Sequence, residues 1–96
     1  MADYASKNQY MLSADPIEAK VKVLNDYAQN YVVDWFGDNA RFLRNNDEIY
    51  AYISSTESTI IYWCLQYGEN IELLEPLATR TKIKNIIKKM SDMYDR

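Results

Sequence analysis

The chain switches repeatedly between two spacings of its apolar residues, and this switching restricts the possible folds more than any other feature. Residues 16–24 (PIEAKVKVL) alternate, which predicts a half-buried strand opened by a proline. Residues 25–37 (NDYAQNYVVDWFG) take a helical spacing, with a cap at Asn25 or Asp26 and an end at Gly37. The stripe expected to face the core of this helix consists of Ala28, Tyr31, Val32, Trp35 and Phe36.

Three further strands are predicted. The segments ARFLR (40–44) and EIYAYIS (48–54) form a hairpin, because the intervening Asn-Asn-Asp residues (45–47) tolerate the dihedral angles of tight turns. The segment NIELLE (70–75) alternates again, with two apolar residues directed toward the core, Ile71 and Leu73.

The second helix lies between the hairpin and the last strand. Ser54 with Glu57 fits a capping box, although Ser55 or Thr56 could equally begin the helix. Gly68 supplies its end. The expected buried stripe is Ile60, Ile61, Cys64 and Leu65, flanked by Trp63 and Tyr67.

A third helix is predicted over residues 77–94. Pro76 fits its first turn, where a missing N–H group is no loss. One side of this helix is apolar, with Ile83, Ile86, Ile87, Met90 and Tyr94. Residues 1–15 have no clean period and are interpreted as a leader or linker, in which Tyr10, Met11 and Leu12 are the residues able to dock on the fold.

The order strand–helix–strand–strand–helix–strand–helix predicts an α+β domain over residues 16–96. With right-handed crossovers, the best arrangement is a ferredoxin-like βαββαβ sandwich that has both helices on one face of the sheet. The additional C-terminal helix would then pack on a sheet edge, on the open face or on another chain.

The composition argues against catalysis. The 96 residues include no histidine, which removes Ser-His-Asp and Cys-His catalysis and histidine-containing metal sites. The single cysteine, Cys64, lies in an apolar run and is interpreted as a core residue. We therefore expect neither an enzyme nor a cofactor. The longest apolar stretch (IIYWCL) is too short to span a membrane, and no signal peptide is visible.

Charge is distributed unevenly along the chain. Residues 1–78 carry 5 basic and 12 acidic side chains, a net charge of −7, whereas residues 79–96 carry 6 basic and 2 acidic ones, a net charge of +4. The cations of the last helix form either a solvated polar face or a contact for an acidic partner, including DNA phosphates. These candidate residues are Lys82, Lys84, Lys88 and Lys89.

Taken in order, several short motifs resemble the C-terminal extension of WYL-domain transcriptional regulators. A helix ending in D-x-F-G corresponds to Asp34–Gly37, and a helix with S…W-x-x-x-[FY]-G corresponds to Ser58–Gly68. A strand of the type V-E-I-L-E-P corresponds to Ile71–Pro76, and the closing helix ends at Tyr94. The resemblance spans about residues 16–94.

Two parts of that family are absent from the chain, the DNA-binding helix-turn-helix and the WYL barrel. The chain is therefore interpreted as an excised C-terminal fragment or a stand-alone copy. The resemblance implies a cytoplasmic bacterial regulator whose C-terminal region serves effector sensing and self-association, with no catalytic residues. The implied partners are the barrel and DNA-binding domain, a second copy in a homodimer, and a small-molecule or nucleotide effector, while DNA would be contacted through the missing N-terminal domain.

Strand alternation also predicts which side chains occupy the sheet face opposite the helices. Tyr50 and Tyr52 have the spacing of the two base-stacking aromatics in RNA-recognition motifs, although the glycine and basic residues of that signature are lacking in NDEIYAYI. The face would be covered by another domain or subunit, bind an effector, or bind single-stranded nucleic acid. The candidate face consists of Lys20, Lys22, Tyr50, Tyr52 and Leu74, with Glu72 beside them.

Overall fold

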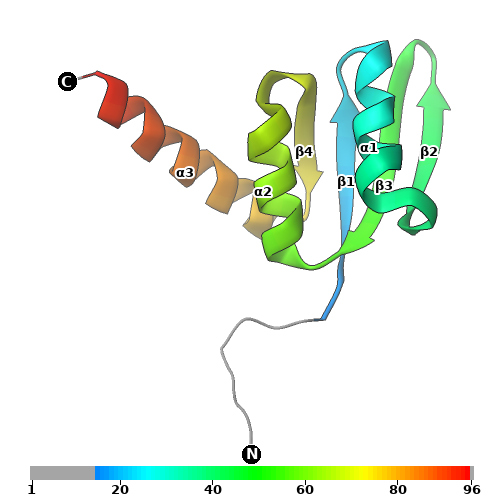
Figure 1. Cartoon of the computed structure of the whole chain (residues 1–96), viewed down its shortest axis with the longest axis horizontal. Helices are drawn as coiled ribbons and strands as arrows, with labels where there is room; N and C mark the ends of the chain where they lie inside the picture. Colours follow the sequence, from blue (N-terminus) through cyan, green and yellow to red (C-terminus); the bar gives the residue numbers. More distant parts are fainter. Residues whose placement is uncertain (1–14, 96) are drawn as a thin grey trace, which may run out of the picture.

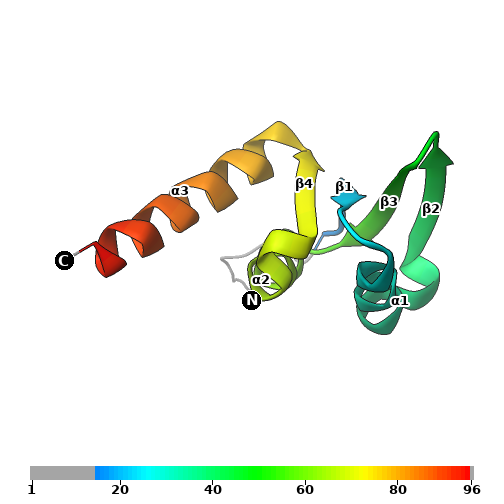
Figure 2. The ribbon, with the colours of Figure 1, turned by 90° about the horizontal axis from the view of Figure 1, so that it is seen from above.

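The structure, a computed structural model, describes residues 15–95 and has the predicted ferredoxin-like fold with an additional C-terminal helix. Figures 1 and 2 show α1 (Gln29–Phe36) and α2 (Glu57–Tyr67) on one face of the sheet, with α3 (Leu77–Tyr94) running away from its edge. The leader predicted for residues 1–15 lies outside the described residues, except for Asp15. The elements are β1 (Ile17–Val23), α1 (Gln29–Phe36), β2 (Ala40–Asn45), β3 (Glu48–Ser55), α2 (Glu57–Tyr67), β4 (Ile71–Glu75) and α3 (Leu77–Tyr94).

The sheet is antiparallel, with the strand order β2-β3-β1-β4. The first strand, β1, is therefore central and pairs with β3 on one side and β4 on the other. β2 and β3 form the predicted hairpin. Asn46 occupies its turn with a φ of 59°, the left-handed conformation that asparagine tolerates better than most residues.

The core lies between the sheet and the two helices α1 and α2. Trp63 is its largest fully buried side chain. The Trp63 ring contacts the ring of Phe36 edge to face, with 5.0 Å between the centroids, and its Nε1–H donates a hydrogen bond to the carbonyl of Tyr31 at 3.2 Å. The predicted alternation and stripes supply most of the remaining core, which includes Ala19, Val21, Val23, Ala28, Val32, Ile49, Ala51, Ile53, Ile60, Cys64, Ile71, Leu73 and Ile83.

The two helix starts differ in detail from the sequence prediction. Of the three alternatives for α2, Thr56 is the cap, and its hydroxyl accepts a hydrogen bond from the backbone N–H of Thr59 at 3.4 Å. The prediction of a capping box that begins at Ser54 is wrong, because β3 continues through Ser55 and Ser54 pairs with Glu18 of β1. Pro76 precedes the first turn of α3 in an extended conformation, so it caps that helix from outside.

One predicted core aromatic lies at the surface. The Trp35 side chain is 43% exposed, whereas Val32 and Phe36 take the sheet-facing positions of α1. Trp35 instead reaches toward α2, where its Nε1–H donates to the Tyr67 hydroxyl at 3.1 Å. The prediction failed because Trp35 stands at the boundary of the helix stripe, where a side chain can cover a neighbouring helix rather than the sheet.

Both glycines end helices, as predicted. Gly37 has a φ of 49° and Gly68 a φ of 33°, and each is the first residue of a short 3-10 turn. These positive angles are costly for residues that carry a Cβ atom.

We expect Gly68→Ala to lower the free energy of unfolding by about 1 kcal/mol through backbone strain, since no atom outside the adjoining residues lies within 4 Å of the added Cβ. Urea denaturation followed by circular dichroism measures this loss. An exposed glutamine on the same helix, Gln66, is the control, because Gln66→Ala should change the stability by less than about 0.5 kcal/mol. A Gly68→Ala domain as stable as the wild type would show that the positive φ is not required.

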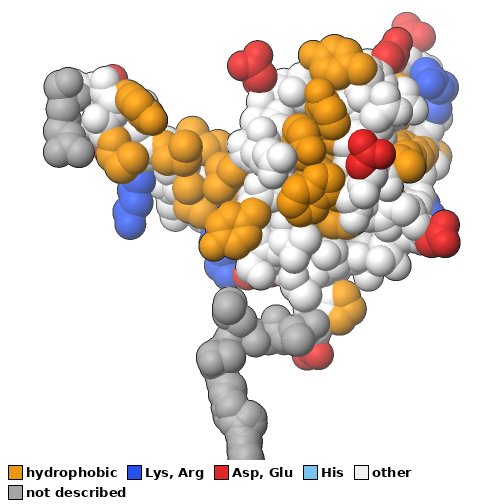
Figure 3. All heavy atoms as spheres, in the orientation of Figure 1, with side chains coloured by type: hydrophobic (Ala, Val, Ile, Leu, Met, Phe, Trp, Pro, Cys, Tyr) orange, Lys and Arg blue, Asp and Glu red, His pale blue; other side chains and the backbone are white. Residues whose placement is uncertain are grey.

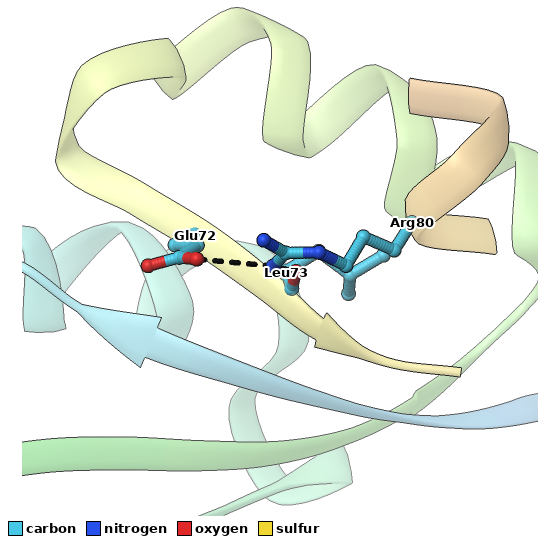
Figure 4. Close-up of polar contacts among 3 residues, drawn as sticks. All are labelled: Glu72, Leu73 and Arg80. Carbon is cyan, nitrogen blue, oxygen red and sulfur yellow. Dashed lines mark hydrogen bonds and ion pairs between the residues drawn. The ribbon is translucent and has the colours of Figure 1, made fainter. Parts of the chain in front are cut away.

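The first two turns of α3 are anchored to the body of the domain. The Arg80 guanidinium binds Glu72 Oε2 at 3.0 Å and donates to the carbonyl of Leu73 at 2.6 Å (Figure 4). On α2, the Glu57 carboxylate accepts from the buried Thr79 hydroxyl and from Lys82 Nζ, both at 2.7 Å. The N-terminal part of α3 is thereby held against both β4 and α2.

The rest of α3 extends away from the other elements (Figures 1 and 2). Of the predicted apolar stripe, Ile83 is buried and Ile86 is partly buried. The other members, Ile87, Met90 and Tyr94, are exposed. The sequence identified the stripe but not its surroundings, because an apolar helix face does not specify what covers it.

Candidate functional site

The predicted candidate residues of the sheet lie on its open face, opposite α1 and α2. Tyr50 and Tyr52 alternate along β3 with Ile49, Ala51 and Ile53, which are buried beneath the helices. Since successive side chains of a strand point to opposite faces, the tyrosines occupy the uncovered side. The same alternation places Lys20, Lys22, Glu72 and Leu74 there.

Two cations approach the tyrosine rings of this open face. The ammonium group of Lys20 lies 5.0 Å from the ring centroid of Tyr50 and 5.8 Å from that of Tyr52. The Arg41 guanidinium carbon is 5.4 Å from the Tyr52 centroid, and this side chain also pairs with Glu18 at 3.1 Å. The rings and cations thus form a flat, half-exposed surface that can stack a planar ligand and attract a negative charge.

A second polar group borders this surface. Glu48 accepts hydrogen bonds from Lys22 Nζ at 2.8 Å and from the Tyr50 hydroxyl at 2.7 Å. The hydrogen bond from Lys22, followed by that from Tyr50, lowers the pKa of the Glu48 carboxyl. The same contacts with Glu48 raise the pKa of Lys22 and of Tyr50, so the phenol remains a neutral donor at neutral pH. These interactions orient the Tyr50 ring.

Leu74 occupies the β4 edge of the open face. The β1–β4 register shifts between Lys20 and Val21, so that Lys20 pairs with Glu75 and Val21 with Leu73. Leu74 therefore lies opposite no residue of β1, and its side chain is half-buried. Such a bulge bends an edge strand and changes the direction of its side chains.

The four lysines of the candidate basic helix lie on α3 and do not join the tyrosines. Lys82 pairs with Glu57, and its side chain is otherwise exposed. Among residues 15–95, no ion pair involves Lys84, Lys88 or Lys89. Because α3 extends beyond β4, the open face of the sheet and the lysines of α3 belong to separate parts of the surface (Figures 1 and 2).

The comparisons with known proteins identify one curated relative. The chain is 34% identical over 83 residues to an uncharacterized HTH-type transcriptional regulator, YobV, of Bacillus subtilis (strain 168). The match covers 84% of this chain and 26% of that protein, so the chain spans about a quarter of the relative's length. No family model and no solved structure matches the chain.

Cys64 is a buried core residue, as predicted, and burial raises the pKa of its thiol to about 12. Along residues 15–95, no three potential metal ligands from histidine, cysteine, aspartate and glutamate gather together, and none of the helices is long and apolar enough to cross a membrane.

The sequence analysis missed two residues of the open face, Arg41 and Leu43. They lie opposite Tyr52 and Tyr50 on β2. They were missed because the sequence analysis placed a three-residue connection at 45–47, whereas the turn consists of Asn46 and Asp47 alone, and this two-residue turn fixes the register.

A second aromatic surface was also missed. The Tyr31 and Tyr67 rings stack between α1 and α2, with 4.1 Å between their centroids. Trp35 packs edge to face on Tyr67 at 6.4 Å, and Tyr27 contacts Tyr31 in the same manner at 6.1 Å. This cluster joins the two helices at the surface and completes the packing around Trp63.

Proposed function

We propose that this domain is a non-catalytic, cytoplasmic regulatory module of a bacterial helix-turn-helix transcriptional regulator, equivalent to the C-terminal extension of WYL-domain regulators. The similarity to part of an HTH-type regulator supports the regulatory role. The motif resemblance supports the narrower assignment, because the residues that carry it have structural positions: Gly37 and Gly68 end helices, and Trp63 fills the core. In this proposal, other parts of the regulator bind DNA.

The open face of the sheet is the proposed regulatory surface. The observation that carries this proposal is the placement of Lys20 between two half-exposed tyrosine rings on a face that no described element covers. A cation held over aromatic rings suits a planar, negatively charged effector, and the flat surface also suits contact with the neighbouring domain. Effector binding at this face would change how the attached DNA-binding domains assemble or orient.

The test is a regulator that carries Tyr50→Ala and Tyr52→Ala together. The effector response of a reporter gene should be lost, and effector affinity should fall at least about tenfold, because each stacked ring contributes roughly 1–3 kcal/mol. The variant domain can also be tested within the Bacillus relative, where it replaces the segment of that protein that matches this chain. Reporter activity and light scattering are the measurements.

Tyr62→Ala is the matched control. This tyrosine is 69% exposed on α2, on the other side of the sheet, so its removal should leave the response intact. An unchanged response and unchanged assembly in the Tyr50→Ala, Tyr52→Ala regulator would exclude the open face from regulation.

A second candidate function is the binding of single-stranded nucleic acid. The spacing of Tyr50 and Tyr52 and the nearby cations Lys20 and Arg41 favour it, whereas the net charge of −3 opposes it. Titration with a labelled oligonucleotide at increasing salt discriminates, since phosphate contacts weaken steeply as salt rises. Absence of binding at low salt would eliminate this alternative.

A further inference from the structure

A groove with a volume of about 620 Å³ lies between the outer part of α3 and the body of the domain. Most of its lining is apolar, with Leu65 and Ile71 on the side of α2 and β4, and Ile87 and Met90 on α3. Figure 3 shows apolar side chains that continue from the outer turns of α3 to its junction with the body. Small-molecule sites usually have apolar walls and volumes of roughly 300–1,000 Å³, so the groove has the size and lining of such a site.

The charged residues of the lining indicate the charge of the ligand. Arg80 is already compensated, because its guanidinium binds Glu72 Oε2 at 3.0 Å and donates to the carbonyl of Leu73 at 2.6 Å (Figure 4). Lys84, in contrast, lines the groove without a hydrogen-bond or ion-pair partner anywhere in residues 15–95. One uncompensated positive charge therefore borders an apolar groove. We propose that this groove binds an alkyl carboxylate, the chemical class of the fatty acids.

The position of Lys84 on α3 suits a ligand that lies along this helix. Residues three and four apart are neighbours on a helix surface, so Lys84, Ile87 and Met90 follow one another along the groove. The two apolar side chains are 52% and 43% exposed, and an alkyl chain laid against them removes apolar surface from water. The carboxylate of the ligand then lies beside the Lys84 ammonium group, where opposite charges attract.

The bound ligand connects α3 to the body beyond the existing anchors. The polar contacts that hold α3, made by Arg80, Thr79 and Lys82, all belong to its first two turns. An alkyl chain between the two walls of the groove would add contacts for the outer turns, and a helix gains most of its stability from burial of its apolar face. This inference does not rest on the open face of the sheet, which contributes no tyrosine to the groove lining.

NMR titration of the isotope-labelled 96-residue chain with monomeric decanoate tests the proposal. The signals of Leu65, Ile71 and Ile87 should shift, because these residues line both walls of the groove. Decyltrimethylammonium has the same alkyl chain and the opposite charge, and it should bind at least about fivefold more weakly. The Tyr50→Ala, Tyr52→Ala variant should bind decanoate like the wild type, which separates this site from the proposed regulatory surface.

Charge reversal at the groove provides the second test. Lys84→Glu should weaken decanoate binding at least about fivefold and strengthen the binding of decyltrimethylammonium. Lys89→Glu is the matched control, because it makes the same change at another exposed residue of α3 that does not line the groove. Both affinities should stay within about twofold in this control at physiological salt, where distant surface charges are screened. Ile87→Gln, which replaces part of the apolar wall, should weaken both ligands.

Hydrogen exchange reports whether the ligand holds the outer turns of α3. Decanoate should slow amide exchange in residues 87–94 at least about threefold and leave β3 unchanged. The proposal is overturned if decanoate does not bind at about 5 mM, if the two amphiphiles bind equally, or if Lys84→Glu and Lys89→Glu have equal effects. Binding to phosphatidylglycerol vesicles without binding of monomeric decanoate would also overturn it, and would assign the groove to a lipid surface instead.

Discussion

Replacement of Trp63 by alanine should lower the free energy of unfolding by about 3–5 kcal/mol, the usual range for removing a buried aromatic side chain. Trp63 is fully buried and contacts Phe36 and Tyr67 through its ring. Its removal also leaves the Tyr31 carbonyl without its indole donor. Since domains of this size are stable by only about 5–15 kcal/mol, the variant should be close to unfolding at 37 °C.

Guanidinium denaturation followed by circular dichroism measures this effect without relying on tryptophan fluorescence. The neighbouring residue is the control, because Tyr62 is exposed on the same helix and Tyr62→Ala should cost less than about 0.5 kcal/mol. A Trp63→Ala domain that unfolds within 1 kcal/mol of the wild type would contradict the position of this ring at the centre of the core.

Loss of the Glu57 carboxylate should have the second largest effect, a decrease of about 2 kcal/mol in the free energy of unfolding for Glu57→Ala. This carboxylate accepts the hydrogen bond of the buried Thr79 hydroxyl, and an unpaired buried donor costs roughly 1–3 kcal/mol. The contact with Lys82 adds little, because that side chain is largely exposed. Denaturation at pH 7 measures the decrease.

Two further variants separate these contributions. Thr79→Val removes the buried hydroxyl while keeping the shape of the side chain, so the added cost of Glu57→Ala in that background should shrink below about 1 kcal/mol. Glu18→Ala, which removes only an exposed ion pair with Arg41, should cost less than about 1 kcal/mol in the wild type. Equal effects of Glu57→Ala with and without the Thr79 hydroxyl would refute the role of this hydrogen bond.

The Glu57 carboxyl should also make the free energy of unfolding depend on pH in the acidic range. The hydrogen bond from Lys82, followed by that from Thr79, lowers the pKa of the Glu57 carboxyl from its ordinary value of 4.5. A carboxyl with a lowered pKa in the folded state stabilises the fold above its unfolded pKa, and this contribution is lost as the pH falls through the folded pKa. The stability difference between wild type and Glu57→Gln should therefore be constant at neutral pH and decrease below about pH 4.5.

The sheet and its two covering helices could be predicted from the sequence because each element combines a clear period with an end signal. Residues 17–23 alternate without interruption, and Gly37 and Gly68 end the two helices where the apolar stripes end. The placement of Tyr50 and Tyr52 on the open face follows from the same alternation. Their proposed role remains a prediction, since alternation determines a side chain's face and not its ligand.

The errors arise where tertiary contacts decide between local alternatives. Ser54 has the residue type of a cap, but pairing with β1 keeps it within β3 and transfers the cap to Thr56. Trp35 fits the helical stripe, but a hydroxyl on the neighbouring helix, that of Tyr67, holds it at the surface. The direction of α3 depends on Arg80 and Glu57, whose partners lie on β4 and α2, and no local pattern encodes those contacts.

The central position of β1 has a consequence for how the domain forms during protein synthesis. Both of its neighbours, β3 and β4, come later in the chain, and β4 begins only at Ile71. A nascent chain that ends before this residue exposes one edge of β1, together with apolar side chains that β4 would otherwise help to enclose. The sheet therefore closes only after most of the domain has left the ribosome, and premature termination upstream of Ile71 should yield a product prone to aggregation.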